Sequence, residues 1–209
     1  MSATTVRKIT LIEPIMIFAL IMAYIWDIRY SHRGAWLAIL GLILLSHRVR
    51  GEHAANLGFD WPNLRSCLER FAPMLAFMVL AMLAAGTLLQ TTRQIRPDQA
   101  FYSWAGYLPW GVFQQYILNG YFLNRFDSVL SRRSAPVLAA ALFSGAHLPN
   151  LFLMAVTLLA GYICARIYRR YHNLYFLGIA HGTIGFCLFL VVPDSISHHL
   201  IVGPGWFAR

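Results

Sequence analysis

Long apolar runs separated by short basic segments limit most strongly how this chain can fold. Of its 209 residues, 58% are hydrophobic and only 12% are charged, whereas about a quarter of the residues in a soluble globular domain are charged. Several runs approach the ~20 residues that a helix needs to cross the hydrocarbon core of a bilayer. They lack the period-two alternation of a membrane β-barrel. The sequence therefore predicts an all-α, polytopic membrane helix bundle.

Seven membrane spans are expected from these runs, at about residues 9–26, 34–46, 71–89, 101–123, 134–147, 151–167 and 174–192. The second run is short for a full crossing. In the polar stretch before the third run, the spacing of Leu64, Cys67, Leu68 and Phe71 predicts a short amphipathic helix at the membrane interface. We divide the chain into N-terminal spans with this interfacial segment (1–100), a core (101–192) and a tail (193–209).

The basic residues lie almost entirely between the apolar runs, although the net charge is +9. This distribution is typical of the positive-inside rule and argues against a nucleic-acid partner. With seven crossings, one side of the membrane receives five of the 17 basic residues, Arg29, Arg33, Arg93, Arg96 and Arg209, and the other side receives the rest. We expect the richer side, which includes the N-terminus, to be cytoplasmic. The expected location is the bacterial inner (cell) membrane.

Three polar side chains interrupt the run at 101–123: Gln114, Gln115 and Asn119. Side-chain amides facing lipid would leave costly unpaired donors and acceptors, so they should face other helices or a cavity. His147 and His181 lie inside two later apolar runs. The helical rise places Gln114 and both histidines roughly 11–20 Å from the same membrane side, near the middle of the bilayer. We therefore predict that these three segments meet.

Two simpler interpretations of these polar residues stay open. Gln, Asn and single histidines in membrane helices often only hydrogen-bond to a neighbouring helix. The shared depth of the polar groups on three helices favours a site instead, and the spacing of Gly178 and Gly182 around His181 predicts that a neighbouring backbone comes close. A metal site is disfavoured, because two histidines without a carboxylate or thiolate make a poor zinc set, even with His198 and His199 nearby in the tail. Cys67, Cys164 and Cys187 match no metal spacing and no disulfide framework. We expect no metal and no other cofactor.

The order and spacing of these residues resemble the CPBP (Abi, CAAX-protease-like) intramembrane peptidases over roughly residues 101–192. The first motif of that family, a glutamate pair followed by arginine and glycine, corresponds to Gln114-Gln115 with Asn119-Gly120. The second, Phe-x-x-x-His, corresponds to Phe143 and His147, and the third, His-x-x-x-Asn, to His181 and Gly185. The resemblance implies a water-activating role for Gln114 and His147, and an oxyanion-donor role for His181.

The departures from the family motifs change the chemistry that the resemblance implies. Glutamine can position a water but cannot accept a proton, and loss of a general base typically costs about 10²–10⁴ in rate. Gly185 in place of asparagine removes an oxyanion donor, which costs about 10²–10³ more. Asn119 in place of arginine removes a cation that neutral Gln114 and Gln115 no longer need. The swap is consistent with a site converted to neutral hydrogen bonding.

Three hypotheses for function follow. The first is a divergent, weakly proteolytic or non-proteolytic family member that binds a membrane-embedded peptide or a lipidated protein. The second is an active intramembrane endopeptidase, of CAAX-processing type, with His147 as its base. The third is a structural subunit of a larger membrane protein complex, in which the polar groups only join helices. The predicted site consists of Gln114, Gln115, His147 and His181 as catalytic positions, with Asn119, Phe143 and Gly185 as binding positions.

Overall fold

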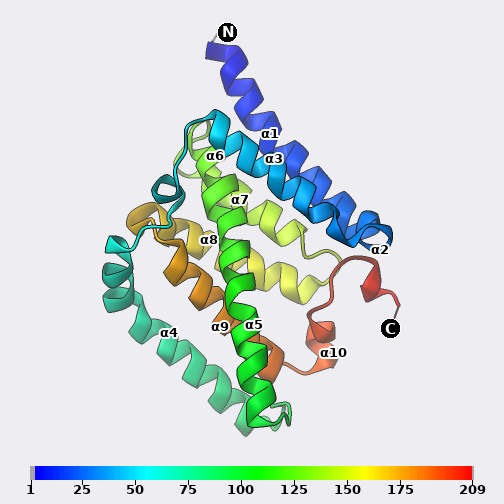
Figure 1. Ribbon diagram of the computed structural model, residues 1–209. Helices are drawn as coiled ribbons and strands as arrows, with labels where there is room; N and C mark the ends of the chain where they lie inside the picture. The colour runs from blue at the N-terminus through cyan, green and yellow to red at the C-terminus, as the bar shows by residue number, and fades with distance from the viewer. Residues whose placement is uncertain (1–2, 209) are drawn as a thin grey trace.

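Every regular element in the computed structural model, which describes residues 3–208, is a helix (Figure 1). The predicted all-α fold is therefore confirmed for this part of the chain. The α-helices are α1 (Ala3–Ala23), α2 (Arg29–Ser31), α3 (Trp36–Val49), α4 (Pro62–Leu88), α5 (Pro97–Gln115), α6 (Asn124–Asp127), α7 (Ser134–Gly145), α8 (Leu151–Tyr171), α9 (Leu174–Val191) and α10 (Asp194–Ser197). Two π-helical segments lie at Tyr24–Ile28 and Tyr116–Leu123, and short 3₁₀ turns lie at Arg33–Ala35, Ala54–Leu57, His198–Leu200 and Gly203–Trp206.

Within the described part of the chain, four helical stretches are long and apolar enough to cross a bilayer: Arg7–Ser31, Ala54–Leu88, Leu151–Tyr171 and Leu174–Val191. Helix α7 is apolar but shorter, at Ser134–Gly145. Helix α3 has only 14 residues, as its short apolar run suggested. The chain is thus an integral membrane helix bundle, and the count of seven crossings stays a prediction.

The expected interfacial helix before the third span is not a separate element. Helix α4 runs without a break for 27 residues, from Pro62 to Leu88. Pro62 stands at its first position, where the missing N–H costs nothing. An i,i+4 ion pair between Arg65 and Glu69, 2.7 Å long, supports the polar first turns. The amphipathic stretch therefore continues directly into the apolar one.

The expected basic loop at 124–133 also begins later than predicted. Helix α5, the π segment Tyr116–Leu123 and α6 follow one another directly from Pro97 to Asp127. Arg125 therefore lies in a helix, and its side chain is only 2% exposed. Counting it among the loop cations was wrong, because two glutamates bind it inside the bundle, as described below.

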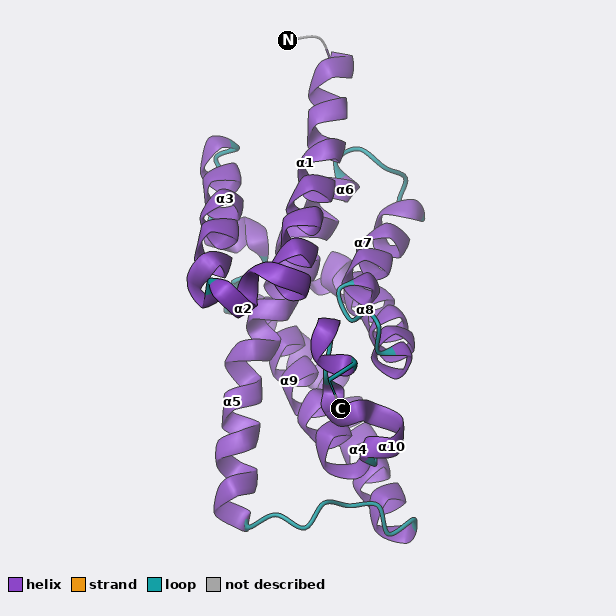
Figure 2. Cartoon of the chain, turned by 90° about the vertical axis from the view of Figure 1, so that its right-hand side faces the viewer, coloured by secondary structure: helices purple, strands orange, loops and turns teal. Residues whose placement is uncertain are grey.

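Helices α5 and α9 cross in close contact through three glycines (Figures 1 and 2). A Cβ added to Gly111 would lie 2.4 Å from the carbonyl oxygen of Gly178, and one added to Gly182 would lie 2.5 Å from the carbonyl oxygen of Tyr107. Real Cβ atoms do not approach backbone so closely, so only glycine allows this separation. The close helix contact predicted from the spacing of Gly178 and Gly182 is confirmed.

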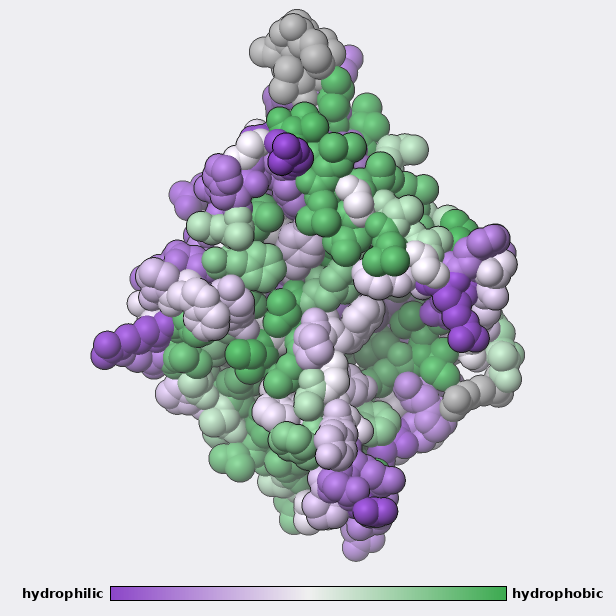
Figure 3. All heavy atoms as spheres, viewed as in Figure 1, coloured by the Kyte–Doolittle hydropathy of each residue, from purple (hydrophilic) through white to green (hydrophobic). Residues whose placement is uncertain are grey.

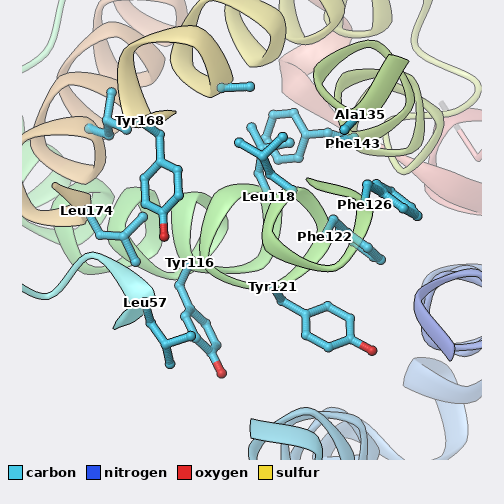
Figure 4. Close-up of a cluster of buried hydrophobic side chains, with 14 of the residues drawn as sticks. Leu57, Tyr116, Leu118, Tyr121, Phe122, Phe126, Ala135, Phe143, Tyr168 and Leu174 are labelled. Carbon is cyan, nitrogen blue, oxygen red and sulfur yellow. The ribbon is translucent and has the colours of Figure 1, made fainter. Parts of the chain in front are cut away.

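The π segment forms the centre of the hydrophobic core (Figure 4). Leu118, Tyr121 and Leu123 are each 0% exposed. Leu118 and Tyr121 point to opposite sides of the helix. Neighbouring elements therefore cover this segment on all sides. Such burial fixes the position of the polar residues at its N-terminal end.

Helix α4 is the opposite case, because it packs chiefly against α9 and leaves large apolar side chains outside. Phe77 is 72% exposed and Leu80 is 65% exposed. Apolar residues also cover much of the face drawn in Figure 3. Such surfaces are costly in water and favourable in hydrocarbon, in agreement with a membrane protein.

We expect Gly182→Val to separate α5 from α9. The new side chain would overlap the Tyr107 backbone, and the overpacking should cost about 3 kcal/mol. The loss should appear as a lower midpoint of thermal unfolding in detergent. Gly41→Val is the matched control, because a Cβ at Gly41 meets no atom within 4 Å. Equal midpoints for the two variants would contradict the glycine-mediated crossing.

Candidate functional site

A cavity of about 780 Å³ lies between the N-terminal helices α1 and α3 and the core helices α5, α7, α8 and α9. Its walls are mainly apolar, with Ile21 and Ile43 on one side and Leu142 and Ile184 on the other. Its size falls in the range of ligand-binding cavities, about 300–1,000 Å³. A recess beside α5 is visible on the face drawn in Figure 3. Few polar side chains line the cavity, so each of them bears on the chemistry that is possible there.

A chain of neutral hydrogen bonds runs from α9 into the π segment. The Nε2 of Gln115 lies 3.0 Å from Nδ1 of His181, and Nδ2 of Asn119 donates to Oε1 of Gln115 over 2.7 Å. Gln115 and Asn119 are both 0% exposed. Because an amide nitrogen only donates, Nδ1 of His181 accepts. A neutral His181 therefore carries its proton on Nε2 and acts as a donor there.

The opposite tautomer is favoured at His147, in the turn after α7. Its Nδ1 lies 2.7 Å from the carbonyl oxygen of Phe143, and a carbonyl only accepts. A neutral His147 therefore has its proton on Nδ1 and a free electron pair on Nε2. The ring of Phe143 lies between the two histidines, with centroids 5.1 Å from His147 and 5.8 Å from His181.

Gln114 and Gly185 complete the predicted set. Gln114 lines the cavity, and its Oε1 is buried with no hydrogen-bond partner among the described residues. Gly185 also lines the cavity, and a Cβ there would lie 3.3 Å from the Tyr107 ring. Gln115 and Asn119 do not line the cavity and are connected to it by hydrogen bonds through His181. Five of the seven positions singled out from sequence thus line the cavity, namely Gln114, Phe143, His147, His181 and Gly185.

The π segment begins directly after the glutamine pair. π-helical turns are rare and occur frequently at functional sites. Here the segment spans eight residues, Tyr116–Leu123. The segment follows the glutamine pair at the end of α5. There the side chain of Gln114 lines the cavity and the side chain of Gln115 reaches His181.

The tail histidines have other partners. His199 lies 2.9 Å from the carboxylate of Asp194, and the ring of His198 lies 3.7 Å from that of Trp206. Within residues 3–208, no group of three or more His, Cys, Asp or Glu side chains could hold a metal ion.

Sequence reasoning missed a cluster of charged residues around Arg125. The guanidinium donates to both carboxylate oxygens of Glu52, over 2.7 and 2.9 Å, and approaches Glu13 at 3.4 Å. Tyr121 donates to Glu13 over 3.0 Å. Glu13 could have indicated this cluster from the sequence, because an acidic residue in an apolar run needs a cationic partner. The cluster joins α1, the α3–α4 connection and α6.

Residues 96–187 match the family model described as type II CAAX prenyl endopeptidase Rce1-like. Neither the comparison with curated proteins nor that with solved structures gave a match. The matched region begins just before α5 and ends within α9, so it contains the histidines and glutamines described above. The resemblance to the CAAX-protease-like (CPBP) family is thereby confirmed for this region, and the chain is an integral membrane protein. The roles assigned to its site residues stay predictions.

We expect Arg125→Leu to destabilise the fold by about 3–5 kcal/mol, because it leaves buried carboxylates without a cation. Thermal unfolding in detergent measures the effect. Arg65→Leu is the control, since the Arg65 side chain is 87% exposed in its ion pair and such pairs contribute only about 0–1 kcal/mol. A midpoint for Arg125→Leu as high as that for Arg65→Leu would show that the cluster does not stabilise the bundle.

The same cluster predicts an acid-dependent loss of stability. Burial raises the pKa of Glu52, but hydrogen bonds from Arg125 and His47 outweigh it and hold the pKa below its ordinary value of 4.5. A carboxyl with a depressed pKa contributes stability above its unfolded-state pKa and loses it as the pH falls through the folded-state value. Unfolding midpoints should therefore drop below about pH 4.5. Glu52→Gln should flatten this drop, and an unchanged acid profile would contradict the assignment.

Proposed function

We propose that the cavity binds an apolar, membrane-embedded peptide segment or a lipid-modified protein segment, and that hydrolysis there is slow or absent. The observation that carries this proposal is the pairing of a large apolar cavity with a neutral polar site. Gln115, His181 and Asn119 form hydrogen bonds without any formal charge. Such a site orients a polar backbone group inside apolar walls, as ligand sites commonly do.

The absence of a carboxylate argues against rapid hydrolysis. Among the described residues that line the cavity there is no Asp or Glu. At the position where the family has its first glutamate, Gln114 offers an oxygen that can orient water and cannot take its proton. Slow turnover follows from the loss of a general base, typically about 10²–10⁴ in rate.

An active endopeptidase is the second candidate, and the histidine tautomers favour it. His147 presents a free electron pair on Nε2, as a base requires, while His181 presents an N–H donor, as an oxyanion site requires. In this mechanism His147 takes the proton of a water that attacks the peptide carbonyl. The proton later goes to the leaving amine, and His181 stabilises the oxyanion.

The proposed setting is a bacterial inner membrane with the N-terminus in the cytoplasm. The excess of arginines on one side supports this orientation by the positive-inside rule. Placing Arg125 inside the bundle removes one cation from that side and leaves the bias in the same direction.

Cleavage of a mixed pool of peptides and lipopeptides by the purified protein separates the two candidates. We expect wild type to cleave no faster than His147→Ala, and we expect Gln114→Glu to raise the rate by about 10² or more, because it restores a proton acceptor. Mass spectrometry of the products measures the rates. Gln99→Glu, outside the cavity, is the matched control for the added charge. Cleavage by wild type that disappears in His147→Ala would instead establish the endopeptidase.

A further inference from the structure

Arg29 is the only Lys, Arg, Asp or Glu among the described residues that line the cavity. Its side chain forms no ion pair with a carboxylate in the part of the chain that the structure describes. A cation on an apolar wall is costly unless an anion or water reaches it. The charge of the cavity wall is therefore complementary to an anionic ligand.

Two neutral acceptors orient the guanidinium of Arg29. Its Nη2 donates to the carbonyl oxygen of Val202 over 3.0 Å and to the hydroxyl oxygen of Tyr30 over 2.8 Å. Neither acceptor cancels the positive charge. The N–H groups on Nε and Nη1 have no acceptor among the described residues, so they remain free to donate to a ligand.

An apolar stripe leads along α1 to this cation. Phe18, Ile21 and Ile25, here called the α1 stripe, precede Arg29 at spacings of three and four residues, and all four side chains line the cavity. Such spacings place side chains on one face of a helix, and the helix continues from α1 through Tyr24–Ile28 into α2. From Phe18 to Arg29 the helical rise adds up to roughly 16 Å. One wall of the cavity is thus apolar along its length and positively charged at one end.

The order of polarity along this wall matches that of a lipid standing in a bilayer. The helical stretch Arg7–Ser31 is long and apolar enough to cross a membrane, and Arg29 lies close to its end. The cation is therefore expected near the level of lipid head groups, and the α1 stripe at the depth of the hydrocarbon. In the view that Figures 1 and 3 share, α2 lies to the right of the recess beside α5.

The α1 stripe suits an acyl chain better than a peptide. A peptide brings backbone N–H and C=O groups, and each one buried without a partner is costly. Phe18, Ile21 and Ile25 offer no hydrogen-bonding side chain. An acyl chain needs none, and an anionic head group at its end would accept charge-assisted hydrogen bonds from Arg29.

We propose that the cavity binds a single-chain anionic lipid, with its carboxylate or phosphate head group at Arg29 and its chain along the α1 stripe. This ligand is a free lipid, and its binding does not depend on the peptide binding proposed above. The site lies on the α1 wall, outside residues 96–187 that match the family model.

Direct binding of tritiated dodecanoate and of its neutral isostere dodecanamide to the purified protein, in a neutral detergent, tests the proposal. We expect wild type to bind dodecanoate about tenfold more tightly, because only the carboxylate accepts charge-assisted hydrogen bonds. Arg29→Gln should abolish this preference and still bind dodecanamide, which shows that the cavity is intact. Arg29→Lys should keep a preference for dodecanoate, because it keeps the charge.

Arg33→Gln is the matched control, since it removes the same charge from an exposed position outside the cavity wall. It should keep the full preference for dodecanoate. Competition by unlabelled dodecyl phosphate then shows whether a phosphate or a carboxylate head group binds more tightly. A dodecanoate with a photoreactive group at the end of its chain should attach near Phe18, and this measurement needs no variant.

Three results would overturn the proposal. The first is equal affinity of wild type for dodecanoate and dodecanamide, and the second is a preference that survives in Arg29→Gln or disappears equally in Arg33→Gln. The third is Arg29-dependent binding of an apolar peptide with a free C-terminal carboxylate while neither lipid binds, which would assign Arg29 to a peptide terminus. That third result leaves the proposed function standing, whereas lipid binding without any binding of peptide or lipopeptide would overturn the proposed function alone.

Discussion

The close crossing of α5 and α9 is the contact on which the rest of the site depends. Because Gly111, Gly178 and Gly182 have no side chains, the two helix backbones meet almost directly. That short separation allows the Gln115 side chain at the end of α5 to reach His181 on α9. A larger residue at the crossing would move the helices apart and break the hydrogen bond without touching either polar group. Packing at the glycines therefore determines the chemistry of the cavity.

Two groups of polar residues, one neutral and one charged, hold the π segment in place. At its N-terminal end, Asn119, Gln115 and His181 form neutral hydrogen bonds that need no compensating charge. Just beyond its C-terminal end, Arg125 binds Glu13 and Glu52 as a buried charged cluster. The carboxylates that are missing from the cavity wall are thus present elsewhere, paired with Arg125, where they join helices. Because the carboxylates lie outside the cavity, the cavity is suited to binding an apolar segment and has few groups that can accept a proton.

Much of this arrangement could be predicted from residue types and spacing. Apolar run length identified the helix bundle, and the shared depth of Gln114, His147 and His181 indicated that their segments meet. The continuous helix through Arg125 could not be predicted, because an arginine after an apolar run reads equally well as a loop cation until its partners are known. Those partners, Glu13 and Glu52, lie 112 and 73 residues away along the chain. The place of Leu200 and Val202 in the cavity wall was also hidden, since the tail is held there by hydrogen bonds to backbone atoms, which carry no residue-specific signal.

The central claim is that an apolar peptide segment enters the cavity rather than resting on the lipid-facing surface. Photo-crosslinking tests it most directly, with a lipopeptide that carries a photoreactive group and mass spectrometry to map the attachment sites. The account predicts attachment at cavity residues such as Phe143 and Ile184, and its loss in Ala160→Trp, which fills the cavity wall. Attachment along the exposed face of α4, at Phe77 or Leu80, that persists in Ala160→Trp would contradict it.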